Sequence, residues 1–184
     1  MLKVTLTRCI ALSLTALLFS CGKDKSDKND DNPNSDDSTP TSSVVKGEIK
    51  GSKWEANTAR VYFTDYKGSQ MISVRLAPFE LEDPCGAPEK LEDHWTVYAR
   101  VPKKLGRVEQ NHENWDKLGV LMNLDHHKYS EGSANVSILM GSGYTSITTI
   151  SDTEVEGAME ITYDDPDSPT RVAGQFTAKV CGSY

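Results

Sequence analysis

Short runs in which apolar and polar residues alternate, separated by turn residues, dominate this chain from residue 44 onward. In residues 71–76 the side chains of Ile72, Val74 and Leu76 alternate with polar ones. A period of two places such apolar side chains on one face of a strand, and no helical period is sustained. Similar short strand-like runs occur at residues 61–64, 95–101, 120–124, 135–140, 144–150, 154–163 and 171–181.

Turn signals separate these runs at nearly regular intervals. Asp65–Gly68 and the acidic stretch 164–169 are rich in turn-forming residues, and Gly141-Ser142-Gly143 is typical of a hairpin turn. Residues 107–117 are mostly polar, and we interpret them as a loop with at most one helical turn. The pattern predicts an all-β fold, an antiparallel β-sandwich or barrel of about 8–10 strands.

The N-terminal 20 residues have a different character. Lys3 and Arg8 precede a ten-residue apolar run, residues 10–19. At about 1.5 Å per residue, a helix of this length spans roughly 15 Å, half of a hydrocarbon core. A positive start followed by a short apolar run is typical of a secretory signal peptide rather than of a membrane span.

The apolar run ends in Leu18-Phe19-Ser20-Cys21, which resembles the lipobox of bacterial lipoproteins. The resemblance implies that Cys21 becomes the first mature residue and carries a diacylglyceryl group and an amide-linked acyl chain such as palmitate. The membrane is then a partner through this lipid anchor, because two or three acyl chains attach a protein stably. Phe19 is bulkier than the residue usual in the family, and a secretory signal with an incidental cysteine is the alternative.

By the same resemblance, Gly22 in place of Asp after the lipidated cysteine favours the outer membrane, at its periplasmic face or at the cell surface. Residues 22–43 contain no aliphatic or aromatic side chain and six Asp against three Lys. Such a segment cannot bury enough apolar surface to order itself. We expect a signal peptide at 1–20, the lipidated cysteine and a disordered linker at 21–43, and a single β-domain at 44–184.

Two further resemblances concern the β-domain. Residues 157–161 and 172–176 flank the acidic turn and resemble the closing hairpin of many uncharacterised envelope lipoproteins, which implies a fold and no activity. Lipocalins carry Gly-x-Trp in their first strand, whereas Gly51-Ser52-Lys53-Trp54 has one residue more. That extra residue would place Gly51 and Trp54 on opposite faces of a strand, so the lipocalin comparison is weak.

The four cysteines do not form one set. Cys9 lies in the leader and Cys21 at its end, which leaves Cys85 and Cys181 for the folded part. Export places both of these thiols in an oxidising compartment, so we predict a disulfide between them. Two buried free thiols or half of a metal site are the alternatives.

The histidines and the acidic turn are the candidate metal ligands. His126 and His127 are neighbours and would face opposite sides of a strand, so they converge only if residues 128–132 begin a turn. Exposed turn histidines are the simpler interpretation, and His94 and His112 lie elsewhere in the sequence. Asp164, Asp165 and Asp167 depart from the spacing of an EF-hand loop, and a hairpin turn explains them without calcium. We assign no metal and no cofactor.

The sequence contains no catalytic motif. Ser142 lies between glycines, but Met140 and Tyr144 break the Gly-x-Ser-x-Gly pattern. Carboxylates are abundant, yet nothing selects a pair for glycoside hydrolysis. Trp54, Trp95 and Trp115 are more typical of a core or a rim than of a ligand platform. We therefore assign no catalytic residue.

A net charge of −7 without a basic cluster argues against nucleic acid as a partner. The sequence favours a lipid-anchored envelope protein of unknown biochemical activity that binds an envelope protein, glycan or lipid, or supports the envelope structurally. A hydrolase and a barrel-type carrier of small ligands are the alternatives. A carrier would contain an apolar internal cavity of several hundred cubic ångströms.

Overall fold

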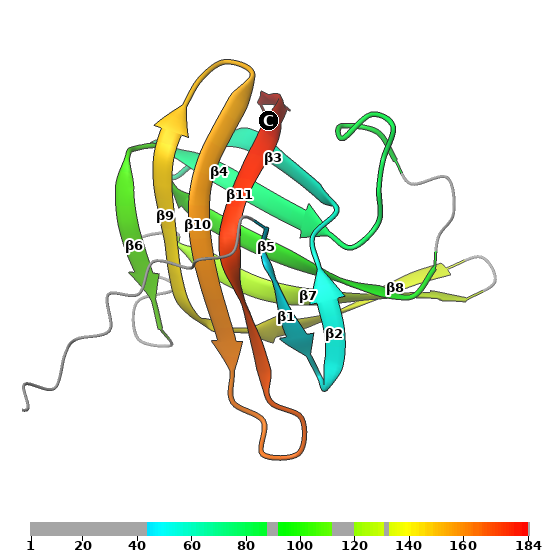
Figure 1. Ribbon diagram of the computed structural model, residues 1–184. Coiled ribbons are helices and arrows are strands. Elements are labelled where there is room, and N and C mark those ends of the chain that lie inside the picture. The colour runs from blue at the N-terminus through cyan, green and yellow to red at the C-terminus, as the bar shows by residue number, and fades with distance from the viewer. Residues whose placement is uncertain (1–43, 88–91, 112–119, 131–132, 184) are drawn as a thin grey trace, which may run out of the picture. The chain divides into compact units, whose positions relative to one another are not determined.

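Eleven strands make up the part of the chain that the computed structural model describes, residues 44–87, 92–111, 120–130 and 133–183. Figure 1 shows them as a strongly curled sheet, which forms a half-barrel. The strands are β1 (Lys46–Ile49), β2 (Ser52–Glu55), β3 (Thr58–Tyr66), β4 (Ser69–Ala77), β5 (His94–Pro102), β6 (Gly106–Gln110), β7 (Leu121–Ser130), β8 (Ser133–Met140), β9 (Ser142–Ile150), β10 (Glu154–Tyr163) and β11 (Thr170–Ser183).

The strands follow the order β6-β9-β10-β11-β3-β4-β5-β7-β8, with β1 and β2 attached beside β11. All pairs are antiparallel except β11 with β3. Strand β11 uses one edge for β10 along ten residue pairs and divides its other edge between β1, opposite residues 171–173, and β3, opposite residues 179–183. The last strand therefore joins the two halves of the sheet.

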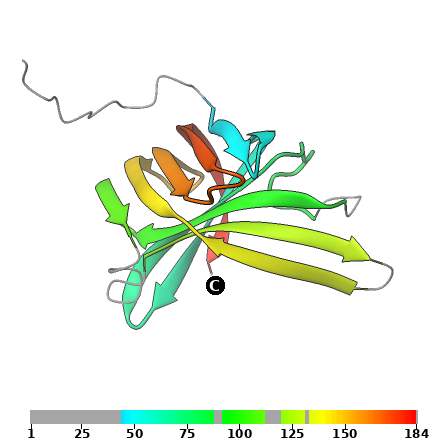
Figure 2. The same ribbon diagram turned by 90° about the horizontal axis from the view of Figure 1, so that it is seen from below.

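The two parts of the curled sheet pack against each other through their apolar faces. Ile72, Val74 and Leu76 of β4, predicted to share a face, are each 0% exposed and belong to the core. The predicted face of β11 is likewise buried at Val172 and Ala178. Figures 1 and 2 show β9, β10 and β11 crossing over the β4–β5–β7 part, so that the two parts cover each other's apolar face. The predicted all-β fold and the closing β10–β11 hairpin are confirmed.

Two tight hairpins have the same local geometry. Lys50 and Gly51 connect β1 to β2 with φ values of 51° and 73°, and Lys67 and Gly68 connect β3 to β4 with φ values of 52° and 80°. Positive φ at both central residues is the type I′ turn that matches the twist of antiparallel strands. The predicted turn at Asp65–Gly68 is therefore confirmed, whereas Gly51 is a turn residue and not part of a strand.

The predicted hairpin at Gly141-Ser142-Gly143 is wrong. Strand β8 pairs with β7, while β9 pairs with β10 and β6, so the chain crosses between the two parts of the sheet here. A Cβ on Gly141 would clash with the side chain of Ile161, and a Cβ on Gly143, whose φ is +147°, would clash with Glu160 O. These glycines permit close packing at a corner.

Residues 107–110, predicted to be part of a loop, form most of β6 and pair with β9. The predictions for the signal peptide, Cys21, the linker, His112 and Trp115 lie outside the described residues. In the part of the chain that is described, no helix is long and apolar enough to cross a membrane.

Candidate functional site

Strand β5 presents different side chains to its two faces. Trp95 and Val97 pack with the core, whereas His94, Thr96 and Tyr98 lie on the opposite face, which we call the outer face. The outer face extends over β3, β4, β5 and β7, because these strands pair directly with one another. His94 stands at the end of β5 that receives the long connection from β4, residues 78–93.

Residues 78–87 of this connection, here called the Cys85 segment, are held against β3 by hydrogen bonds. The Thr58 hydroxyl donates to Phe79 O at 2.5 Å, and the Asn57 amide donates to Pro78 O at 2.7 Å. Arg60 Nη1 donates to Gly86 O at 3.0 Å. Asn57 and the first part of β3 therefore fix both ends of the segment.

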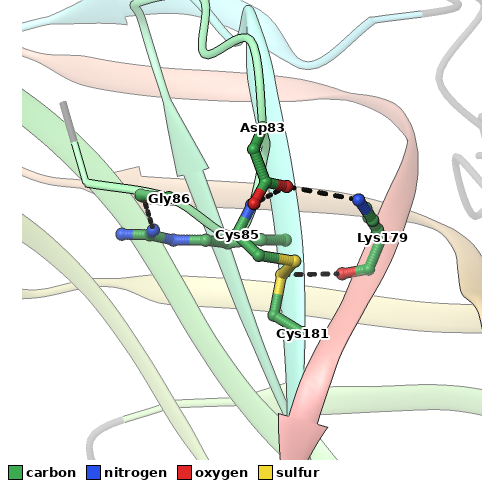
Figure 3. The surroundings of a disulfide bond; sticks show 6 residues. Asp83, Cys85, Gly86, Lys179 and Cys181 are labelled. Carbon is green, nitrogen blue, oxygen red and sulfur yellow. Dashed lines mark hydrogen bonds and ion pairs between the residues drawn. A yellow bond between two sulfur atoms is a disulfide. The ribbon is translucent and has the colours of Figure 1, made fainter. Parts of the chain in front are cut away.

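A disulfide also fixes the Cys85 segment to β11. Cys85 and Cys181, the pair that remained after the leader cysteines, are bonded with their Cα atoms 5.3 Å apart. Figure 3 shows Asp83 and Lys179 beside this bond, with Lys179 Nζ 3.2 Å from Asp83 Oδ1. The N–H of Cys85 and then the ammonium of Lys179 hold the pKa of the Asp83 carboxyl below its ordinary value.

A pocket of about 640 Å³ lies between the Cys85 segment and the start of β5. Its apolar lining includes Phe79 and Leu81, and His94 forms part of its wall. Five carboxylate side chains also line it, namely Glu80, Glu82, Asp83, Glu92 and Asp93. The volume is in the range of small-molecule sites, and the combination of rings and carboxylates suits a ligand that has both an apolar part and a positive charge.

Aromatic rings continue the wall of this pocket along the outer face. The ring of Phe79 meets His94 edge to face at 4.9 Å, and His94 stacks on His127 at 4.8 Å. Tyr129 lies 5.9 Å from His94 and extends the stack. His94 Nδ1 is 2.6 Å from Glu92 O and Tyr129 N donates to Asp93 Oδ1 at 2.8 Å, so these contacts fix the pocket's rim.

The expectation that His126 and His127 lie in an exposed turn is wrong. Both lie within β7 and face opposite sides, as neighbours in a strand do, and His126 stacks on Trp95 at 4.3 Å. Burial lowers the pKa of both imidazoles, and for His127 the neighbouring His94 lowers it further. Among the described residues, no group of three or more His, Cys, Asp or Glu is placed to hold a metal ion.

The acidic turn after β10 is used for a structural contact. The ammonium of Lys50 forms an ion pair with Asp165, which also accepts the N–H of Asp167 at 3.1 Å. The hydrogen bond from Lys50 is the main cause of the lowered pKa of Asp165. Asp165 therefore connects the β1–β2 turn to the β10–β11 turn.

A second polar group lies near the centre of the outer face. Arg75 covers the ring of Tyr98 at 5.5 Å, and the Tyr98 hydroxyl is 3.2 Å from Ser73 Oγ, in a hollow of about 180 Å³. Burial raises the pKa of Asp125, while the charge of Arg75 opposes that shift. The Oδ1 atom of Asp125 has no hydrogen-bond partner within the described ranges.

Trp54, Trp95 and Ser142, which were also candidates from the sequence, contribute to packing and strand pairing. Trp54 is 7% exposed and donates from Nε1 to Trp95 O at 2.9 Å, and Trp95 is partly buried against the core, so both positions agree with the predicted core or rim. Ser142 begins β9, where its carbonyl accepts a hydrogen bond from Thr162.

Sequence reasoning missed the pocket. The available signal was the length of the β4–β5 connection, because a connection of more than about 12–15 residues is uncommon without a function. Comparison of the chain with family models, with curated proteins and with solved structures gives no match.

Proposed function

We propose that this chain is a lipoprotein anchored in the cell envelope through Cys21, and that its β-domain is a binding module. Its ligand site is the pocket between the Cys85 segment and His94. The ligand is a small molecule that combines an amine with an apolar or aromatic part. The observation that carries this proposal is the lining of the pocket, in which five carboxylates surround Phe79, Leu81 and His94.

Electrostatics supports a cationic ligand. A single charge pair at 4 Å is worth about 1 kcal/mol in water and about 4 kcal/mol at the effective dielectric near a protein surface. The carboxylates of Glu80, Glu82 and Glu92 are exposed, so each contact is weak and screened by salt. Several such carboxylates around one pocket together attract a cationic ligand, and the aromatic wall supplies cation–π contacts.

Binding fits the carboxylates better than hydrolysis does. Asp83 is engaged by Lys179 and the N–H of Cys85, and Asp93 accepts the N–H of Tyr129. These contacts hold both carboxylates in fixed positions, and those to Asp83 lower its pKa, whereas a general acid needs a raised pKa. A barrel-type carrier is also less favoured, since the pocket lies beside the Cys85 segment and the apolar face of the sheet is filled by side chains.

The lipid anchor is tested by the intact mass of full-length protein extracted from membranes. We expect a chain that begins at Cys21 and carries a diacylglyceryl group and an amide-linked acyl chain. The variant Cys21→Ala should accumulate as unprocessed precursor. An unmodified N-terminus at another position would contradict the anchor and would leave the pocket untouched.

The pocket is tested by calorimetric titration of the full chain with 2-phenylethylamine and with its neutral counterpart 2-phenylethanol. We expect saturable binding of the amine that weakens as salt is added, and much weaker binding of the alcohol. The double variant Glu80→Gln/Glu82→Gln should weaken the amine and leave the alcohol unchanged. Equal affinities for amine and alcohol would exclude recognition of the charge.

A further inference from the structure

The two ends of the main strand path, β6 and β8, differ in how their free edges are protected. Strand β6 forms one edge; it has five residues, and Arg107 and Glu109 on it form an ion pair at 2.5 Å. Strand β8 forms the other edge, and none of its eight residues is charged or proline. No other described strand pairs with the second edge of β8. Natural proteins block edge strands with charges, proline or short length, so an unblocked edge indicates that the edge is used.

The side chains on β8 support this conclusion. Val136 is 49% exposed and Ile138 is 58% exposed, and within the described residues Leu105 is the one other large apolar side chain that is exposed to this degree. Both lie on the outer face, opposite His127 and Asp125 of β7. Figures 1 and 2 show the start of β8 on the side of the domain away from β6.

The hydrogen-bond pattern of the hairpin shows which peptide groups point outward. Gly141 N donates to Met122 O at 3.0 Å, so these two residues form a hydrogen-bonded pair. Hydrogen-bonded and non-hydrogen-bonded pairs alternate along an antiparallel ladder. Residues 135, 137 and 139 therefore bond to β7, and the N–H and C=O groups of residues 134, 136, 138 and 140 point toward the free edge.

We infer that the free edge of β8 pairs in antiparallel fashion with β8 of a second copy of this chain, about a two-fold axis at Ser137. In this register Val136 lies opposite Ile138 of the other copy, and residue 134 lies opposite residue 140. All outward-pointing peptide groups of residues 134–140 then meet partners. The exposed apolar side chains of both copies form one strip on the outer face.

A second copy fits this edge better than an unrelated strand for two reasons. The chain carries a net charge of −7, which repels copies in general, and β8 contributes no charge to that repulsion. Each copy also has a single edge of this kind among its described strands, because β6 carries Arg107 and Glu109 and β2 carries Lys53 and Glu55, so the assembly closes at two. Attachment to one membrane, which rests on the proposed function, would raise the local concentration of a weakly pairing edge.

The register is tested by disulfide crosslinking of the full chain in the cells that make it. Ser137→Cys places two thiols at the axis, where directly opposed Cβ atoms lie about 4.5–5.5 Å apart, within reach of a disulfide after small adjustment. Asn135→Cys is the matched control, because it is also exposed on β8 but lies opposite residue 139 of the other copy. We expect a covalent dimer with Ser137→Cys and only the background of the parent chain with Asn135→Cys.

Adding Ile138→Lys to Ser137→Cys places a charge at the edge and should abolish the crosslink. Ile138 is exposed, so folding should persist, and an intact Cys85–Cys181 disulfide verifies it. Equal crosslinking of Ser137→Cys and Asn135→Cys, or none with Ser137→Cys, would overturn the proposed pairing. Purified full-length chain at high concentration should crosslink in the same way, and that result does not depend on the lipid anchor or the pocket.

Discussion

Two acidic connections in this domain have similar composition and different structures. Residues 78–93 join β4 to β5, residues 164–169 join β10 to β11, and both combine Asp with Pro. The first is fixed by a disulfide and by hydrogen bonds from Asn57, Thr58 and Arg60, and it lines a pocket. The second is held by the ion pair of Lys50 with Asp165 and forms a turn.

The comparison shows that acidic residues alone do not make a binding site. Carboxylates repel one another, so a cluster of them around a cavity needs other contacts to hold the chain in place. The disulfide and the hydrogen bonds to β3 provide those contacts for residues 78–87. Residues 164–169 lack such support among the described contacts, and their carboxylates point to solvent or to Lys50.

The largest effect is expected from removing the disulfide. In Cys85→Ser/Cys181→Ser, the loop of 96 residues is no longer closed, and the free energy of unfolding should fall by about 2–4 kcal/mol. The Cys85 segment should also lose its fixed position, so affinity for 2-phenylethylamine should fall under conditions where the domain is still folded. Urea unfolding and calorimetry measure the two effects. Unchanged amine affinity in the folded variant would show that the disulfide does not organise the pocket.

A smaller loss of stability is expected when a hydrogen bond at the Cys85 segment or beside the β10–β11 turn is removed, and its effect on ligand binding should differ between the two places. Thr58 and Thr170 are 6% and 3% exposed, and each hydroxyl makes one hydrogen bond, to Phe79 O and from Lys50 N respectively. Thr58→Val and Thr170→Val should each lower the free energy of unfolding by about 1 kcal/mol, because each removes one buried hydrogen bond. Thermal unfolding monitors stability and calorimetry monitors binding.

Only Thr58→Val should weaken the binding of 2-phenylethylamine, since Phe79 belongs to the pocket wall. Thr170→Val is the matched control for general destabilisation. If both variants weakened the amine equally, the loss would reflect stability and not the geometry of the Cys85 segment.

The smallest effect concerns acid stability. The pKa values of Asp83 and Asp165 are lowered in the folded chain, so both carboxylates stabilise it above the ordinary Asp pKa of about 3.9. That contribution is lost as the pH falls through the lowered pKa values. Asp83 is exposed and Asp165 is partly exposed, and each is paired with a surface lysine, so the effect should be small and salt-dependent.

Asp83→Asn and Asp165→Asn should each flatten the dependence of the unfolding midpoint on pH below about pH 4. Only Asp83→Asn should also weaken the amine, because Asp83 lines the pocket. A steeper acid dependence in either variant would contradict the assigned direction of the shift.

Sequence patterns predicted those elements whose burial follows a period of two. In β4 and β11 every second side chain is buried on the core side, so the alternation was visible without the fold. Strand β6 was missed because Val108 is its one apolar side chain, and pairing with β9 defines it instead. The corner at Gly141 was missed because glycine is needed there to leave room for the side chain of Ile161, a residue distant in sequence.

The disulfide followed from counting cysteines, but the pocket did not follow from any local signal. His94 meets His127 only because β5 and β7 pair in the register that places them opposite each other. Phe79 reaches His94 because Thr58 and Cys181 hold the Cys85 segment, and these two residues come from strands that are distant in sequence. Such contacts depend on the complete topology, which short-range patterns do not determine.

The most direct test of the proposed pocket is an NMR titration of the full chain with 2-phenylethylamine, followed through the imidazole resonances of His94 and His126. His94 lines the pocket, whereas His126 stacks on Trp95 at the opposite face of the same strands and serves as an internal control. We predict saturable shifts of the His94 resonances, with those of His126 unchanged. Shifts of equal size at both rings, or no saturable shift at His94, would contradict a ligand site between the Cys85 segment and β5.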